Sequence, residues 1–195
     1  MIYDKMKSIK TRIEIPALLK QHGLNNKICE IGVRFGYHFQ QLLTCNPRMA
    51  IAIDHYAKTK NPAEQDTNIG QEELAGIYCD VFKRFADEPA VRIIRESSLK
   101  ASNFFPLFYF DYVYIDADHS YEGCLRDIRL WWGKVRQGGV LAGHDYIDKK
   151  SQNGVDFGVI RAVADFMAEK NIDKKFLHHT EEGYRTWLLY KEDGE

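Results

Sequence analysis

Asp-Tyr-Val-Tyr-Ile-Asp-Ala-Asp-His spans residues 111–119, and Gly-Val-Leu-Ala-Gly-His-Asp-Tyr spans residues 139–146. The runs at 112–115 and 139–143 are short and apolar, so both predict buried strands. Acidic and imidazole side chains follow the two runs directly: Asp116, Asp118, His119, His144 and Asp145. Ligands of open α/β sheets bind outside the carboxyl ends of the strands. The pattern therefore predicts a reaction centre where these two strands end.

Strand and helix patterns alternate along the rest of the chain, which predicts a mostly parallel sheet flanked by helices. The expected strands lie at residues 27–31, 49–53, 90–95, 111–116, 139–143, 176–179 and 184–190. The short turn Glu-Glu-Gly at 181–183 joins the last two strands as an antiparallel hairpin. The expected fold class is α/β, with a seven-stranded, mostly parallel sheet, helices on both faces and one antiparallel strand near the C-terminus.

Helices are predicted before and between these strands, at residues 15–21, 37–44, 71–86 and 155–169, with a short helix or loop at 99–105. A helix after the fourth strand has one apolar face, formed by Tyr121, Leu125, Ile128, Trp132 and Val135. The length of 195 residues favours a single domain. We expect residues 1–25 to be a helical extension and residues 26–195 to be the core. The polar segments 57–70 and 146–154 are predicted to form a lid.

The composition is that of an ordinary soluble globular protein, with 45% hydrophobic and 28% charged residues. The formal net charge is −1, so the chain lacks the basic footprint of a nucleic-acid-binding protein. No apolar stretch reaches the length of a membrane span, and the first residues lack the apolar core of a signal peptide. The cysteines lack zinc-type or CxxC spacing, which favours free thiols in a reducing compartment. We therefore expect a cytoplasmic protein with neither a nucleic-acid nor a membrane partner.

A glycine motif, Glu-Ile-Gly-Val-Arg-Phe-Gly at residues 30–36, closes the first strand and opens the next helix. Gly32 lets the backbone turn tightly, and Gly36 lets a ligand or a helix approach closely. The spacing lacks one glycine of the dinucleotide fingerprint G-x-G-x-x-G. Glu30 would repel a pyrophosphate but attract an ammonium group. The motif therefore favours a cofactor with a cationic amino-acid end, such as S-adenosylmethionine, and an ordinary strand-to-helix turn is the alternative.

Two further residues are candidates for the nucleoside part of a cofactor. Asp54 ends the second strand, and its spacing of about 20 residues from the glycine turn suits a carboxylate that binds both ribose hydroxyls. NAD and S-adenosylmethionine both contain such a ribose, so Asp54 does not distinguish between them. The alternative is a carboxylate that binds nearby backbone amides. Ser97 follows the third strand, where its hydroxyl would bond an adenine edge or would simply stabilise a turn.

The polar residues after the fourth and fifth strands are candidates for metal binding and proton transfer. Asp116, His144 and Asp145 together offer ligands for a divalent cation. His119 is predicted to be a general base because an imidazole titrates near neutral pH. Two structural alternatives remain open, with Asp118 as a cap of the following helix and His144 as a hydrogen-bonded supporting residue.

Together these residues resemble the class I S-adenosylmethionine-dependent methyltransferases. The resemblance rests on the glycine motif, the ribose acid and the fourth-strand motif: residues 30–36, Asp54 and residues 111–116. Residues 116–127 with 138–146 resemble the metal-dependent O-methyltransferases of sugars and natural products, of the methyltransferase domain 24 type. The similarity covers roughly residues 26–190 and implies a Rossmann-like fold.

The resemblance also implies roles for individual residues. The cofactor S-adenosylmethionine would be bound by Glu30, Gly32, Gly36, Asp54, Ser97 and Asp116. The metal ligands would be Asp116, His144 and Asp145, and the catalytic residues His119 and Asp116. Histidine at 144 departs from the acid that is usual there, and an imidazole suits manganese, iron or zinc better than magnesium. Serine at 97 also stands where relatives often carry an acid.

The expected function is therefore S-adenosylmethionine-dependent O-methylation of a small-molecule or saccharide hydroxyl, assisted by magnesium or manganese if a metal binds. Two alternatives remain open: a non-catalytic methyltransferase-like binding domain, and a metal-dependent hydroxylase or NAD-dependent oxidoreductase on the same fold. The glycine spacing speaks against NAD, and the presence of His119 beside Asp116 speaks against a loss of catalysis. The sequence does not identify the acceptor, and it is compatible with a homo-oligomer.

Overall fold

The computed structural model of the chain describes residues 2–58, 69–147 and 157–192. The predicted lid segments fall mainly on residues 59–68 and 148–156, which lie outside the described residues. The first two residues of the helix predicted at 155–169 lie outside them as well.

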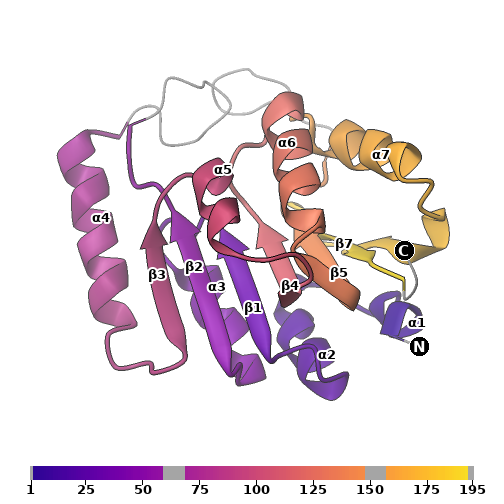
Figure 1. Cartoon of the computed structure of the whole chain (residues 1–195), viewed down its shortest axis with the longest axis horizontal. Coiled ribbons are helices and arrows are strands. Elements are labelled where there is room, and N and C mark those ends of the chain that lie inside the picture. The colour runs from indigo at the N-terminus through magenta and orange to yellow at the C-terminus, as the bar shows by residue number, and fades with distance from the viewer. Residues whose placement is uncertain (1, 59–68, 148–156, 193–195) are drawn as a thin grey trace.

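A single seven-stranded sheet forms the centre of the molecule (Figure 1). Its strands are β1 (Lys27–Ile31), β2 (Met49–Asp54), β3 (Val91–Arg95), β4 (Phe110–Ile115), β5 (Val135–Gly143), β6 (Leu177–His179) and β7 (Trp187–Tyr190). Their order is β3-β2-β1-β4-β5-β7-β6. The first five strands pair in parallel, and β7 runs antiparallel to both β5 and β6. The predicted fold class, including the single antiparallel strand, is confirmed.

Helices pack on both faces of this sheet, with α5 and α6 in front and α3 behind in the view of Figure 1. The helices are α1 (Ile2–Met6), α2 (Ile15–Gln21), α3 (Tyr37–Leu42), α4 (Gln71–Arg84), α5 (Ser98–Ala101), α6 (Tyr121–Trp132) and α7 (Val159–Glu169). Short 3-10 turns lie at Arg12–Glu14, Leu43–Cys45, Ser102–Phe104 and Lys174–Phe176. Within the described ranges, none of the helices is long and apolar enough to cross a membrane.

The prediction that Val135 lies on the apolar face of α6 is wrong. The helix ends at Trp132, and Val135 begins β5, where it is fully buried opposite Phe110. An apolar residue in the next strand happened to continue the helical spacing across Gly133. The last strand is also shorter than predicted, because it begins at Trp187 and leaves Tyr184 exposed.

The strand register determines which polar residues become neighbours. Ile31 pairs with both Ile53 and Ile115, and Ile115 also pairs with Gly143. The residues that follow these positions therefore emerge side by side at one edge of the sheet. This edge collects the ends of β1, β2, β4 and β5.

Gly32 is the point of closest approach between two of these strand ends. Its φ is +85°, and a Cβ atom there would lie 2.0 Å from the backbone oxygen of Asp116. Only glycine fits this position, because a side chain would be strained and would overlap the neighbouring backbone. Gly36 has a φ of +77°, and a Cβ there would lie 2.9 Å from the ring of Phe85. Gly36 is thus explained by packing against the end of α4.

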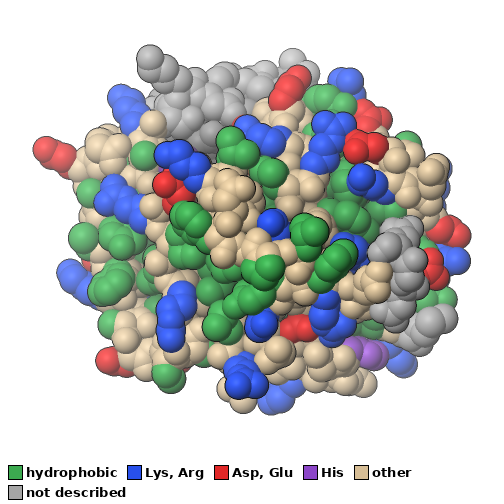
Figure 2. Space-filling view, in the orientation of Figure 1, with side chains coloured by type: hydrophobic (Ala, Val, Ile, Leu, Met, Phe, Trp, Pro, Cys, Tyr) green, Lys and Arg blue, Asp and Glu red, His purple; other side chains and the backbone are tan. Residues whose placement is uncertain are grey.

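The face formed by α5 and α6 is mixed in character (Figure 2). Lysine and arginine side chains lie there among acidic and hydrophobic ones. Four large apolar side chains of the segment from α5 to β4 are exposed: Leu99, Phe104, Leu107 and Phe108. The described part of this face shows no uniform basic surface of the kind that binds a nucleic-acid backbone. All four cysteines are free thiols, and Cys79 alone among them is exposed.

Candidate active site

A cleft of about 610 Å³ opens at the carboxyl ends of the parallel strands. It is lined by nearly all the predicted site residues: Glu30, Gly32, Asp54, Ser97, Asp116, His119, His144 and Asp145. Gly36 does not line it, in keeping with its contact with Phe85. The location agrees with the rule that ligands of α/β sheets bind where the strands end.

His119 lies between two carboxylates at one end of this cleft. Its Nε2 is 3.1 Å from Oδ1 of Asp116 and 2.9 Å from Oδ2 of Asp145. His144 lies beside them, with its Nδ1 3.6 Å from Oδ1 of Asp116 and 3.4 Å from Oδ1 of Asp145. Four of the five residues predicted to converge therefore lie together, and we call them the acid–histidine cluster. The fifth, Asp118, lines the same cleft but contacts Arg126 and Ser120 instead.

The backbone holds this cluster in place through the sheet. The amide of His144 donates to the carbonyl of Ile115, which extends the pairing of β4 and β5 by one residue. Asp145 then adopts a φ of +54°, which is uncommon for a residue with a side chain. Strained backbone of this kind concentrates at functional sites. The turn directs the Asp145 carboxylate back toward His119.

The cluster changes the proton affinity of its members. Burial lowers the pKa of His119, but hydrogen bonds with Asp116 and Asp145 outweigh burial and raise it to about 10. Burial likewise lowers the pKa of His144, but Asp145 and Asp116 raise it above its ordinary value. Burial would raise the pKa of both carboxyl groups, yet the two histidines hold each of them below its usual range. At neutral pH, His119 is therefore protonated in this arrangement.

Asp116, His144 and Asp145 are the predicted metal ligands, and one candidate ligand atom from each lies within 4.8 Å of the others. Among the described residues, Oδ1 of Asp145 is a buried oxygen without a hydrogen-bond partner, and this would suit a cation. The imidazole does not fit as well, because Nε2 of His144 faces Nη1 of Arg12 at 3.2 Å. A histidine that binds a metal normally donates its second N–H to an acceptor. Arginine has no acceptor to offer.

Glu30 lies in β1, lines the cleft and is 1% exposed. Burial raises the pKa of Glu30. Its Oε2 lies 3.3 Å from Nδ1 of His38, at the start of α3, and has no hydrogen bond within the described ranges. The ring of His38 packs against Tyr114, with the ring centres 4.1 Å apart. A buried carboxylate of this kind favours a cationic ligand.

Asp54 accepts hydrogen bonds from two backbone amides. Its Oδ2 accepts from the amide of Arg34 at 2.8 Å, and its Oδ1 accepts from the amide of Tyr56 at 2.9 Å. The structural alternative of amide binding is thus observed. Each carboxylate oxygen keeps a second acceptor site, so these contacts are compatible with the predicted role of Asp54 in ribose binding.

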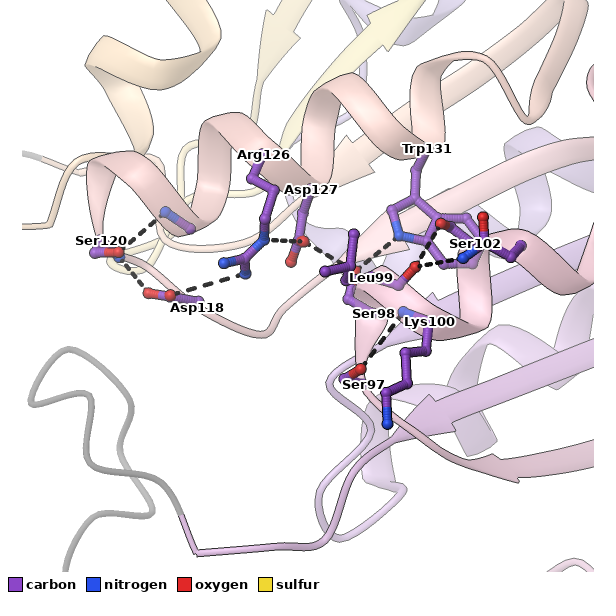
Figure 3. Close-up of polar contacts among 12 residues, drawn as sticks. Ser97, Ser98, Leu99, Lys100, Ser102, Asp118, Ser120, Arg126, Asp127 and Trp131 are labelled. Carbon is purple, nitrogen blue, oxygen red and sulfur yellow. Dashed lines mark hydrogen bonds and ion pairs between the residues drawn. The ribbon is translucent and has the colours of Figure 1, made fainter.

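The side of the cleft between α5 and α6 carries a polar network (Figure 3). Ser97 caps α5 by accepting from the amide of Lys100, so the turn role considered for this serine is confirmed. Asp118 accepts from the amide of Ser120 at 2.9 Å, but the residue that caps α6 is Ser120 itself, whose hydroxyl accepts from the amide of Gly123 at 3.1 Å. Ser98 accepts from Trp131 and donates to the fully buried Asp127, each at 2.9 Å.

We expect Asp127→Asn to increase stability at neutral pH. Burial raises the pKa of Asp127 to about 6, against the opposing charge of Arg126. The unfolded aspartate titrates near pH 3.9, so the folded state favours the protonated acid. The negative charge of Asp127 therefore destabilises the folded state fully above about pH 6 and not at all below about pH 4. At pH 7, the free energy of unfolding of the variant should exceed that of the wild type by up to about 3 kcal/mol.

Urea unfolding of both proteins at pH 7 and pH 4 would check this. Asp80→Asn, at an exposed acid of α4, is the control and should show no such difference. An equal effect of Asp127→Asn at both pH values would contradict the assignment.

Three cleft residues, Arg12, His38 and Asp127, were not predicted from the sequence. Arg12 and His38 belong to no motif, and only the fold brings them to the strand ends. Asp127 had a usable signal, because its spacing from Cys124 and Trp131 places it on the buried face of α6.

Arg12 reaches the cluster from the N-terminal segment, which is attached to the loop before β7. The amide of Arg12 donates to Oε1 of Glu182 at 3.0 Å, and the amide of Glu181 donates to the carbonyl of Lys10 at 2.8 Å. The side chains of Lys10 and Glu181 also form an ion pair. The predicted extension therefore contributes Arg12 to the wall of the cleft.

Comparisons with known proteins agree with this geometry. A family model described as a methyltransferase domain matches residues 29–146, more than half of the chain. An O-methyltransferase from Bacillus cereus, solved in complex with SAH, has 16% identity and a TM-score of 0.60, over 92% of this chain and 80% of that one. An rRNA methylase from Streptococcus thermophilus has 14% identity and a TM-score of 0.62, over 95% and 99% of the two chains.

Spermidine synthase from Thermotoga maritima has 15% identity and a TM-score of 0.53, over 97% of this chain and 59% of that one. At these identities the likeness shows the fold alone, which hosts several activities. No curated protein sequence matches the chain. The family match, the sheet order and the cleft at the strand ends lead to one conclusion: the chain belongs to the methyltransferase domain family, within the class I S-adenosylmethionine-dependent methyltransferases.

Proposed function

We propose that the chain transfers a methyl group from S-adenosylmethionine to a hydroxyl oxygen of a small molecule or saccharide. The observation that supports this is the position of His119, between Asp116 and Asp145 and in the same cleft as the glycine turn. A base beside a cofactor site is the arrangement that removal of a hydroxyl proton requires.

The cofactor side of the cleft suits S-adenosylmethionine. The buried Oε2 of Glu30 has no hydrogen bond in the described part of the chain, and the carboxylate would bind the ammonium group of the methionine end. Asp54 would bind the ribose, and the backbone of Gly32 would lie against the cofactor between them. When bound, S-adenosylmethionine supplies a methyl group that its sulfonium charge makes electrophilic. Glu30 disfavours the pyrophosphate of NAD at the same place.

The acceptor would bind at the acid–histidine cluster. The resting imidazolium of His119 would first release its own proton to solvent. Nε2 of the neutral ring would then take the hydroxyl proton, and Asp116 and Asp145 would stabilise the imidazolium that forms again. Their contacts give His119 a high proton affinity. A positive charge nearby lowers the pKa of an imidazole, so His119 would lose its resting proton more readily in the loaded cleft. The protein would contribute mainly alignment and deprotonation.

Glu30→Gln is expected to weaken S-adenosylmethionine binding by roughly 10- to 100-fold, because a hydrogen bond to a charged group contributes about 1.5–3 kcal/mol. Titration calorimetry in EDTA would measure this, with micromolar binding expected for the wild-type protein. Glu72→Gln, at an exposed position in the first turn of α4, is the matched control.

The same titration tests the proposed function itself. Absence of binding to the wild-type protein would favour a scaffold role for the fold. After binding is established, formation of S-adenosylhomocysteine in the presence of saccharide and phenolic hydroxyl compounds would identify the acceptor class. Product formation with nitrogen or carbon acceptors alone would overturn the O-methylation proposal.

A further inference from the structure

Arg12 restricts the protonation of His144. Nη1 of Arg12 lies 3.2 Å from Nε2 of His144. A guanidinium group only donates hydrogen bonds, so Nε2 must accept this one with its lone pair. The proton of a neutral His144 ring therefore resides on Nδ1.

Nδ1 is also the atom that a metal would need. It is the His144 nitrogen that faces the carboxylates, 3.4 Å from Oδ1 of Asp145 and 3.6 Å from Oδ1 of Asp116. A nitrogen that carries a proton cannot coordinate a cation. A doubly protonated ring would carry a proton on Nδ1 as well, so neither form offers a ligand here.

The charge of Arg12 acts in the same direction as its hydrogen bond. Arginine remains protonated in proteins, and its guanidinium interacts electrostatically with Asp116. It therefore brings a permanent positive charge to the carboxylates that a divalent cation would use. Two cations at one small cluster repel each other.

We propose that Arg12 holds His144 in a form that cannot bind metal and that Arg12 is the positive partner of the cluster in place of a divalent cation. The inference rests on the proposed function, in which this cleft is the site of methyl transfer. Arg12 is then a positioning residue from outside the matched domain of residues 29–146. Methyl transfer by this chain would require no added metal.

Manganese binding tests this without an activity assay. We would titrate Mn²⁺ into EDTA-treated wild-type, Arg12→Met and Arg12→Lys proteins and follow free Mn²⁺ by electron paramagnetic resonance. Arg12→Met should bind Mn²⁺ at least about 10-fold more tightly than wild type, the scale on which groups behind a metal ligand act. Arg12→Lys keeps a charged donor and should resemble wild type. Arg126→Met removes an arginine from the other side of the cleft and should not increase the affinity.

Nitrogen-15 spectra of the His144 ring provide a second readout that a merely structural role would not change. The wild-type ring should show a protonated Nδ1, and Arg12→Met with Zn²⁺, a diamagnetic cation that imidazole binds well, should lose that state. Thermal unfolding would confirm that the variants are folded.

The outcomes separate this inference from the proposed function. Mn²⁺ binding that is equally tight in wild type and Arg12→Met, or a bare Nδ1 in the wild-type ring, would overturn the role of Arg12. Absence of S-adenosylmethionine binding to the same wild-type sample would overturn the proposed function instead.

Discussion

The His119→Gln variant is expected to transfer methyl groups roughly 10²- to 10⁴-fold more slowly than the wild-type protein, the range for loss of a general base. Glutamine fills a similar space and still bonds carboxylates, but it cannot take up a proton. Cofactor affinity should stay unchanged, because His119 lies at the acceptor end of the cleft, next to Asp116 and Asp145. Single-turnover transfer of a labelled methyl group, with calorimetry of cofactor binding, would measure both.

His178→Gln is the control for this experiment. His178 is partly buried and bonds the carbonyl of Ile9, outside the cleft. A wild-type rate in His119→Gln would exclude this residue as the base, whereas equal losses in both variants would point to a general effect of histidine removal on folding.

Gly32→Ala is expected to lower the free energy of unfolding by roughly 2–5 kcal/mol, from left-handed strain and overpacking together. The new Cβ would lie 2.0 Å from the carbonyl oxygen of Asp116. Relaxation is restricted because both backbones are fixed: Gly32 donates to Ile53 at 2.9 Å, and Asp116 donates to Ile31 at 2.8 Å. Urea unfolding would measure the change.

Gly23→Ala separates the two contributions. Gly23 also has a positive φ, +66°, but a Cβ there would meet no atom of the described residues within 4 Å. This variant should lose only the strain component, about 1–2 kcal/mol. Similar losses at the two positions would show that the contact with Asp116 is unimportant.

The sequence predicted the parts of the site that lie next to strand ends. Asp54, Asp116 and Asp145 each follow a short apolar run, and parallel pairing brings such positions to one edge. Because this register depends on hydrophobic pattern and topology, it can be inferred before side-chain contacts are known. The same reasoning failed at Val135, where helical spacing continued by chance across Gly133 into β5.

Other parts of the site could not be read from local pattern. Arg12 acts through His144, which is far away in the sequence, and their contact depends on how the N-terminal segment docks on the loop before β7. His38 lies in the short helix α3, and the spacing of the apolar residues in that helix does not predict that His38 contacts Glu30. The pKa of His119 was expected near neutrality, and the two carboxylates raise it to about 10.

The origin of Arg12 has a consequence for how such a protein can diversify. The strand ends position the residues proposed to bind the cofactor and the two acids of the acid–histidine cluster, whereas the guanidinium comes from a peripheral segment attached by a few polar contacts. With the role proposed for Arg12, exchange of that segment would change metal dependence, while the glycine turn and strand register stay intact. A graft of residues 8–14 onto a relative would transplant this trait without redesign of its core.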